Sequence, residues 1–382
     1  MAISWPGVLV LWRQRFYPLV HDLILPFYLW FFAVTESISR TDPIGGFLGL
    51  EPAGCGDLLS YWGARDAPGW VNATSALAAL VTRLRPRRVW LPGYICAELV
   101  GAVPPQARRF FPLTDDLCPD IAALKRELVP GDMVLAVNMF GCAPGPAWRD
   151  FVAAHPGVSF VEDCAQTLET GEAAWGDWRL YSPRKLVGVP EGGLLVPISA
   201  RAEARAPHIH PDMALQVDQR PGCQTRLAPL LARQDAPQDN ALWHPLHQAA
   251  EASHRISAAP MSLLARDMLS RLDPAAMITA RKRNYAHLSR VLGGHALWPE
   301  TDPQFAPSGF AVRVAAQRRA GVLAHLHGHK IFAAVHWRDI PAPAGFVADH
   351  ARAASLITLP CDHRYGVGEM QTVAEVFLAA CR

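Results

Sequence analysis

Short apolar runs alternate with helical spacing through the middle of this chain. Runs typical of strands lie near residues 88–91, 109–111, 133–138 and 159–162. Between them, apolar residues recur every three or four positions, as they do over residues 77–84. Strands that alternate with helices are typical of a doubly wound, mostly parallel sheet. The pattern therefore predicts an α/β fold.

The pattern changes twice after residue 200. Residues 200–253 are rich in Pro, Gln, His and Ala and show weak periodicity, which predicts an irregular excursion. A helical pattern resumes after Ile256 and runs past Tyr285. Strand-like runs at 310–314 and 331–335 enclose a helical stretch, and an amphipathic helix ends the chain. These elements predict a smaller α+β unit.

The amino-terminal segment is dense in aromatic and aliphatic residues. Its uncharged run from Leu23 to Thr35 is shorter than the roughly 20 residues of a membrane-spanning helix, and Pro26 interrupts it. No small-residue cleavage site follows, so we expect no signal peptide. Two interpretations remain, namely peripheral contact with a membrane or an arm that packs on the protein or on a second copy. We favour packing.

Composition indicates an ordinary globular protein. With 382 residues, of which 51% are hydrophobic, the chain can fill a large core and a smaller one. A formal net charge of +2 gives no electrostatic argument for nucleic-acid binding. The eight cysteines form no CxxC pair, which favours reduced thiols in a cytoplasmic protein. Histidines in residues 200–253 are dispersed without a carboxylate cluster, so we assign no metal.

The stretch from Phe160 to Val196 carries the candidate chemistry. Its first strand ends at Glu162 and Asp163, so the Asp163 carboxylate is expected at the carboxyl end of the sheet, where α/β proteins bind ligands. Lys185 follows between two short strands. From there its side chain can reach back into the same crevice.

A lysine and a carboxylate so placed are what a pyridoxal 5'-phosphate (PLP) enzyme requires. The lysine holds the aldehyde as a Schiff base, and the carboxylate keeps the pyridine nitrogen protonated. Once freed, the lysine can carry a proton taken from the substrate carbon. Taken singly, Asp163 would more often cap a helix, and Lys185 would be a surface charge. Their order and spacing carry the prediction.

These residues resemble a family, the fold-type I PLP enzymes of the DegT/StrS group, mostly aminotransferases acting on nucleotide-linked keto sugars. Its EDxAQ, GD, PxK and EGG elements are matched in order by residues 162–166, 176–177, 183–185 and 191–193. The likeness extends upstream to residues 137–141 and to the loop at residues 72–77. It covers roughly residues 55–200, more weakly the remainder.

The resemblance implies a role for each matching residue. Lys185 and Asp163 would be catalytic. The residues implied to bind the cofactor are Asp163, Gln166, Lys185, Thr74, Ser75, Tyr94 and Ser182. Thr74 and Ser75 precede a helical pattern, and a helix N-terminus flanked by hydroxyls can bind phosphate. Without that context, the loop would more often be a plain helix cap.

Three positions depart from the family pattern, one of them Pro190 in place of the glycine commonly found before the EGG turn. Leu180 stands where the family usually carries a serine that contacts the cofactor phosphate, so Ser182 is the nearest hydroxyl. Cys96 stands at the expected position of the aromatic residue that stacks on the cofactor ring, so Tyr94 is the nearest aromatic candidate.

The resemblance also implies an organisation into parts. We divide the chain into an aromatic-rich segment at residues 1–45, a large PLP-binding domain at 46–255, and a bridging helix with a small C-terminal domain at 256–382. Because the family's active sites lie at a subunit interface, a homodimer is expected.

The implied reaction moves an amino group from an amino acid donor, glutamate, to a keto sugar carried on a nucleotide. Trp337 at a strand end and Arg364 before the last helix are candidates for substrate contacts. Two alternatives stay open. One is a non-catalytic or regulatory relative that uses the fold for binding, and the other is a PLP enzyme acting on a non-sugar carbonyl substrate.

Overall fold

The computed structural model describes residues 42–169, 175–215, 220–298 and 306–382. Residues 43–382 form one compact unit, separate from the residues before it. The expected aromatic arm lies outside the described residues. Within the described ranges, no helix has both the length and the hydropathy needed to cross a bilayer.

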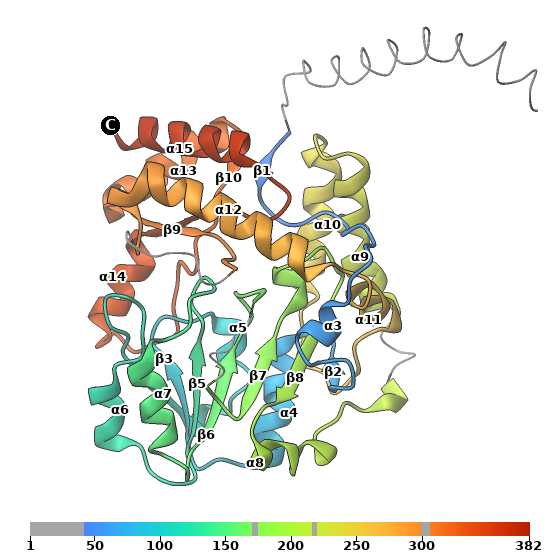
Figure 1. Cartoon of the computed structure of the whole chain (residues 1–382), viewed down its shortest axis with the longest axis vertical. Helices are drawn as coiled ribbons and strands as arrows, with labels where there is room; N and C mark the ends of the chain where they lie inside the picture. Colours follow the sequence, from blue (N-terminus) through green and yellow to red (C-terminus); the bar gives the residue numbers. More distant parts are fainter. Residues whose placement is uncertain (1–41, 170–174, 216–219, 299–305) are drawn as a thin grey trace, which may run out of the picture. The chain divides into compact units, whose positions relative to one another are not determined.

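A seven-stranded sheet organises this unit (Figure 1). In spatial order its strands are β2 (Gly69–Trp70), β8 (Gly193–Pro197), β7 (Trp178–Tyr181), β6 (Ser159–Asp163), β5 (Met133–Val137), β3 (Val89–Pro92) and β4 (Arg108–Phe111). The strands from β7 to β4 pair in parallel, whereas β8 and β2 join in antiparallel fashion. The predicted α/β class with a mostly parallel sheet is confirmed.

The sheet is buried on both faces, as its near-continuous apolar strands require. Every residue of β5 and of β3 is buried. The helix α4 (Ala73–Leu84) begins at Asn72, whose side-chain oxygen accepts a hydrogen bond from the backbone N–H of Ser75. It packs on β7 and β8 with its apolar face. The local sequence signals therefore agree with the observed elements.

The remaining helices surround the sheet and extend to the C-terminus (Figure 1). They are α3 (Leu58–Tyr61), α5 (Ala97–Val100), α6 (Ile121–Glu127), α7 (Pro146–Ala153), α8 (Ala200–Glu203), α9 (Arg220–Asp235), α10 (Asn240–Ala252), α11 (Leu263–Leu269), α12 (Pro274–Leu292), α13 (Ala316–Gly328), α14 (Val347–Ser355) and α15 (Val367–Cys381).

A second layer of structure covers the upper edge of the sheet in Figure 1. There β9 (Phe310–Arg313) pairs antiparallel with β11 (Leu356–Leu359), and β10 (Ile331–Phe332) pairs in parallel with β1 (Ile44–Gly45). Side chains of α12, α13 and α15 share an apolar core with these strands. The boundaries at residues 45 and 255 stay a prediction, although this core draws on α12 and the elements that follow it.

The expected irregular excursion at 200–253 is wrong over most of its length. The structure forms α9 and α10 there, and the two helices pack side by side (Figure 1). Pro229 and Pro245 lie inside them and weaken the sequence signal. Burial of Leu230 and Trp243 compensates, because most helical stability comes from tertiary packing.

Candidate functional site

Strand topology brings the predicted lysine and carboxylate together. Asp163 ends β6 and Tyr181 ends β7, and these strands are parallel neighbours. Their carboxyl ends therefore lie at the same edge of the sheet. Lys185 sits in the 3₁₀ turn η2 (Pro183–Lys185) just beyond β7. Lys185 and Asp163 line one cavity of about 710 Å³.

The Lys185 side chain is exposed to this cavity. Its backbone N–H donates to the carbonyl of Ser182 at 3.1 Å, which fixes the turn. Across the described residues, no hydrogen bond or ion pair holds its ammonium group. The amine is therefore available to a ligand.

Asp163 is only 3% exposed. Its Oδ1 accepts a hydrogen bond of 2.8 Å from the backbone N–H of Ala165. Burial raises the pKa of this carboxyl, and the charge of Lys185 and the Ala165 hydrogen bond offset the rise only partly. A buried acid in this state would be stabilised as an anion by a cationic N–H from a ligand.

The loop before α4 reaches the same edge. Thr74 lines the cavity, and its Oγ1 lies 3.4 Å from Nε2 of His254. Gly193 permits the close approach of β8 to this loop, because a Cβ at Gly193 would lie 2.1 Å from the carbonyl carbon of Asn72. The N-terminus of α4 therefore opens toward the lysine turn.

Ser75 is not among the cavity-lining residues. Its hydroxyl instead accepts a 3.0 Å hydrogen bond from the backbone N–H of Ser257. Ser182 does line the cavity, whereas Leu180 is buried in the core. The hydroxyl that is absent at Leu180 is thus present two residues later.

Gln166 lines the cavity beside Asp163. Its Oε1 accepts a 2.7 Å hydrogen bond from the backbone N–H of Phe140. Because Oε1 of Gln166 is engaged by this backbone contact, the NH₂ group of the same amide is left to donate a hydrogen bond to a ligand.

Tyr94 does not reach the cavity. It is fully buried, its hydroxyl has no hydrogen-bond partner among the described residues, and its ring centroid lies 5.2 Å from that of Trp337. Cys96 and Trp337 line the cavity instead. Tyr94 therefore packs behind Trp337 in the wall of the cavity. This geometry does not favour stacking of the Tyr94 ring on a ligand.

His336, which precedes Trp337 and follows the predicted strand, lines the same cavity. Burial, with the nearby Lys185 charge, lowers the pKa of His336 to about 4. Its Nδ1 lies 3.0 Å from Oγ1 of Thr358. The imidazole is therefore neutral near pH 7 and adds no charge beside the lysine.

Arg364 lines the cavity, but its guanidinium is already engaged. Its Nε and Nη2 pair with the two carboxylate oxygens of Asp362 at 2.8 and 2.9 Å, and its Nη1 donates to the carbonyl of Phe47 at 3.2 Å. The guanidinium N–H groups that would bind a substrate anion are therefore already occupied. The predicted anion contact by Arg364 would require this pair to open.

Several other acids of the motif are structural. Glu162 pairs with Arg179 at 2.9 Å, and Asp177 accepts a 2.9 Å hydrogen bond from the backbone N–H of Phe160. Glu191 is fully buried and accepts a 2.7 Å hydrogen bond from the backbone N–H of Ser262. These residues hold the strands and loops that carry Asp163 and Lys185.

One face of α10 also lines the cavity. His247 and Glu251 lie four residues apart in α10, which places them on one side of the helix, and His254 follows just beyond the end of the helix. Glu251 pairs with Arg184 at 2.8 Å. Helical spacing was the signal that could have found them, but the sequence there was interpreted as irregular.

Comparisons with known proteins address the fold. No model of a known protein family matches this sequence, and no curated protein sequence matches it. Solved structures do match. DesV from S. venezuelae, solved in complex with a ketimine intermediate, superposes with a TM-score of 0.59 at 18% identity, over 96% of this chain and 97% of DesV.

Two further structures extend the likeness. The PLP form of Spr1654 from Streptococcus pneumoniae, described as a sugar aminotransferase, gives a TM-score of 0.56 at 15% identity, over 91% of this chain and 94% of Spr1654. A DegT DnrJ EryC1 StrS aminotransferase from Brucella abortus gives 0.56 at 14% identity, over 98% of both chains. This chain has the fold of these aminotransferases. The structural likeness agrees with the resemblance found in the sequence motifs.

Proposed function

We propose that this protein is a PLP-dependent aminotransferase. The observation that carries the proposal is the convergence of the unpaired Lys185 amine and the buried Asp163 carboxylate on one cavity. Perturbed acids beside a free nucleophile in a cleft are typical of catalytic sites. The fold shared with crystallised PLP forms supports the same assignment.

The residues present fit the cofactor. Asp163 is an acid whose pKa is raised by burial and which lacks a cationic partner in hydrogen-bond contact among the described residues. Thr74, Ser182 and the N-terminus of α4 form a polar cradle at the same edge of the sheet. When bound, PLP supplies an electrophilic aldehyde and a ring that accepts electrons from the substrate carbon.

Each side chain then has a defined task. Lys185 would hold the aldehyde through Nζ and would later move a proton at that atom. Asp163 would hold the proton on the pyridine nitrogen. Thr74 and Ser182 would bind the phosphate, and Gln166 would donate its amide N–H to a ring substituent. His336 and Trp337 form part of the wall of the cavity that contains the lysine.

We propose glutamate as the amino donor and a nucleotide-linked keto sugar as the acceptor. Two observations support a large acceptor. The cavity of about 710 Å³ lies in the upper part of the range of ligand pockets, and one structural neighbour, Spr1654, is described as a sugar aminotransferase. A cytoplasmic homodimer is part of the same proposal.

The test is the absorption spectrum of the purified full-length protein with PLP, before and after L-glutamate. We expect a visible band that bleaches with glutamate, and no such band from Lys185→Ala, because Lys185 is the one lysine among the described residues that line the cavity with Asp163. Lys125→Ala, on the exposed surface of α6, is the matched control and keeps the band. Absence of the band from the wild-type protein would end the enzyme proposal in favour of a binding function. A band that glutamate does not bleach would instead reject glutamate as donor.

A further inference from the structure

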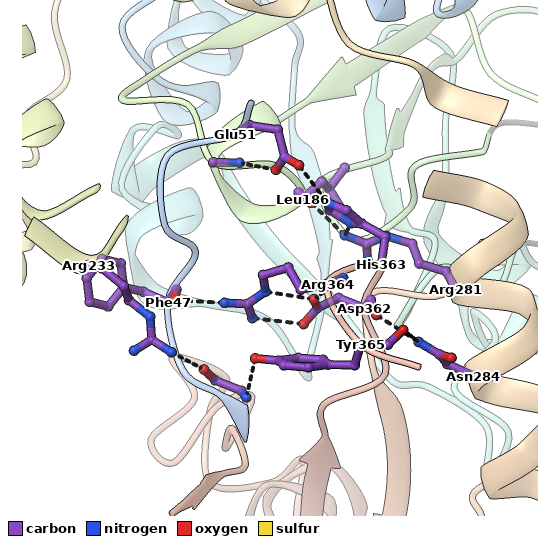
Figure 2. A network of polar contacts seen from close by, with 12 residues as sticks. Phe47, Glu51, Leu186, Arg233, Arg281, Asn284, Asp362, His363, Arg364 and Tyr365 are labelled. Atoms are coloured by element: carbon purple, nitrogen blue, oxygen red, sulfur yellow. Dashed lines mark hydrogen bonds and ion pairs between the residues drawn. The ribbon is translucent and has the colours of Figure 1, made fainter. Parts of the chain in front are cut away.

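The long helix α12 delivers a buried arginine to the lysine turn. Arg281 is 1% exposed, lines the cavity, and donates from Nη2 to the carbonyl of Leu186 at 2.6 Å (Figure 2). Its Nη1 donates to the carbonyl of Pro307 at 3.0 Å. Leu186 is the residue that directly follows Lys185. The arginine therefore holds the backbone next to the candidate catalytic amine.

A histidine and a glutamate continue this contact. Arg281 Nη2 lies 3.1 Å from Nδ1 of His363, and an arginine can only donate, so Nδ1 accepts. The histidine proton is thereby placed on Nε2, which donates to Oε1 of Glu51 at 2.9 Å. His363 thus links the Glu51 carboxylate to the Arg281 guanidinium.

Glu51 returns the chain of contacts to the lysine turn. Its Oε2 accepts a 3.0 Å hydrogen bond from the backbone N–H of Gly188, and its own N–H donates to the Gly188 carbonyl at 2.9 Å. Figure 2 shows Glu51, His363 and Arg281 in one continuous network that reaches Leu186. Residues 186 and 188 are therefore held by one network of hydrogen bonds, whose members Glu51, Arg281 and His363 come from three separate segments of the chain.

We propose that Glu51, His363 and Arg281 form a relay that positions Lys185. The proposal rests on the proposed function. Lys185 itself has no side-chain partner in the described part of the chain, so its direction depends on the backbone that carries it. Strand β7 fixes the N-terminal side of the turn, and the relay fixes the C-terminal side.

Burial of the Arg281 guanidinium carries a desolvation penalty, and this penalty argues for a role beyond packing. Arg281 is fully buried and its Nε has no partner among the described residues. An apolar side chain would fill this volume without the desolvation penalty of a guanidinium. An apolar side chain cannot donate hydrogen bonds to two carbonyls and a histidine at once, as the Arg281 guanidinium does.

The first test separates holding the cofactor from presenting the amine. Dissociation constants are measured for PLP, through its visible band, and for pyridoxamine 5'-phosphate, which has no aldehyde for the lysine. In Arg281→Met and His363→Leu we expect apparent PLP affinity to fall by about tenfold to a hundredfold, the cost of roughly 1 Å of misplacement. Affinity for pyridoxamine 5'-phosphate stays unchanged.

Matched variants sharpen this result. His363→Gln keeps an acceptor toward Arg281 and a donor toward Glu51, so it should retain wild-type PLP affinity. Arg283→Met removes a nearby arginine of α12 that contacts the Tyr365 carbonyl instead, and should also behave as wild type. Equal losses for both ligands would show a merely structural role and overturn the proposal, as would wild-type behaviour of Arg281→Met.

A second measurement needs no cofactor. Hydrogen–deuterium exchange of the cofactor-free protein should show faster exchange of a peptide spanning residues 183–190 in Arg281→Met, with β5 unchanged. If wild type binds neither ligand, the proposed function fails, and this exchange still decides whether the relay holds the turn. Unchanged exchange in residues 183–190 overturns the relay whatever the protein binds.

Discussion

At the residue scale, the site depends on a carboxylate whose burial disfavours its charged form. Asp163 is 3% exposed, and burial raises its pKa. An acid whose pKa is higher in the folded than in the unfolded protein destabilises the fold at neutral pH. In the proposed function, a bound cationic partner would offset the free-energy cost of this burial, which is the usual balance between stability and activity at a site.

Asp163→Asn should therefore separate stability from function. The amide oxygen can still accept the Ala165 N–H, and the desolvated charge is removed. We expect the cofactor-free variant to melt at or above the wild-type temperature. Its half-reaction with L-glutamate should slow by roughly a hundredfold or more, because the charge that stabilises the protonated ring nitrogen is lost.

Thermal melts without cofactor and stopped-flow spectra with PLP and glutamate measure both effects. Asp150→Asn, on the exposed side of α7, serves as the control. A clear fall in melting temperature for Asp163→Asn would contradict the assignment of Asp163 as a strained acid.

At the element scale, the site is made by two close approaches between elements. Parallel pairing of β6 with β7 places Asp163 beside the start of the lysine turn. The contact of β8 with the loop before α4 then adds Thr74. In the second contact, backbone meets backbone at Gly193 and Asn72, which leaves no room for a side chain.

Gly193→Ala tests this second approach. Its Cβ would lie 2.1 Å from the Asn72 carbonyl carbon, so β8 and the loop must separate. We expect a loss of about 1–3 kcal/mol in the free energy of unfolding. We also expect the ratio of PLP affinity to pyridoxal affinity to be smaller than in the wild-type protein. The ratio would fall because, in the proposed function, the loop before α4 would hold the phosphate, which pyridoxal lacks.

The control is Gly294→Ala, since a Cβ at Gly294 would meet no atom within 4 Å. Denaturant unfolding and PLP titration of both variants decide the matter. If Gly193→Ala were as stable as wild type and bound PLP equally well, the close approach would have no part in the site.

At the scale of the whole molecule, a few long-range polar contacts join its parts. Glu51 lies far from His363 in sequence, yet their side chains pair at 2.9 Å, and Arg233 of α9 donates to the Gly45 carbonyl at 2.9 Å. Burial alone would raise the pKa of Glu51, but the hydrogen bonds from His363 and from the Gly188 backbone help to lower it overall. These contacts tie the segment at residues 44–51 to both α9 and the C-terminal unit.

Glu51→Gln should consequently destabilise the protein in a pH-dependent way. Because the pKa of Glu51 is lower in the folded protein than its ordinary value of about 4.3, its contribution is complete above that value and disappears as the pH falls through the folded pKa. We expect a deficit of about 1–3 kcal/mol at pH 7 that shrinks below about pH 4. Urea unfolding of both proteins at several pH values measures it, and a deficit independent of pH would refute the ionic origin.

The sequence by itself predicted the central strands of the large sheet, the helix α4 and the main residues of the candidate site. Periodicity located β3 to β6 and α4, since apolar spacing follows directly from strand and helix geometry. The order of Asp163, Gln166 and Lys185 predicted residues that line one cavity, because the ends of neighbouring parallel strands must share an edge. Local physics was enough for these points.

Only the tertiary structure decided the rest. The helices α9 and α10 escaped detection because their stability comes from packing on one another, and the proline-rich sequence hides it. Burial of Tyr94 and pairing of Arg364 with Asp362 depend on residues distant in the chain. The Glu51, His363 and Arg281 relay is invisible in sequence for the same reason, since no local pattern records which distant side chains will meet.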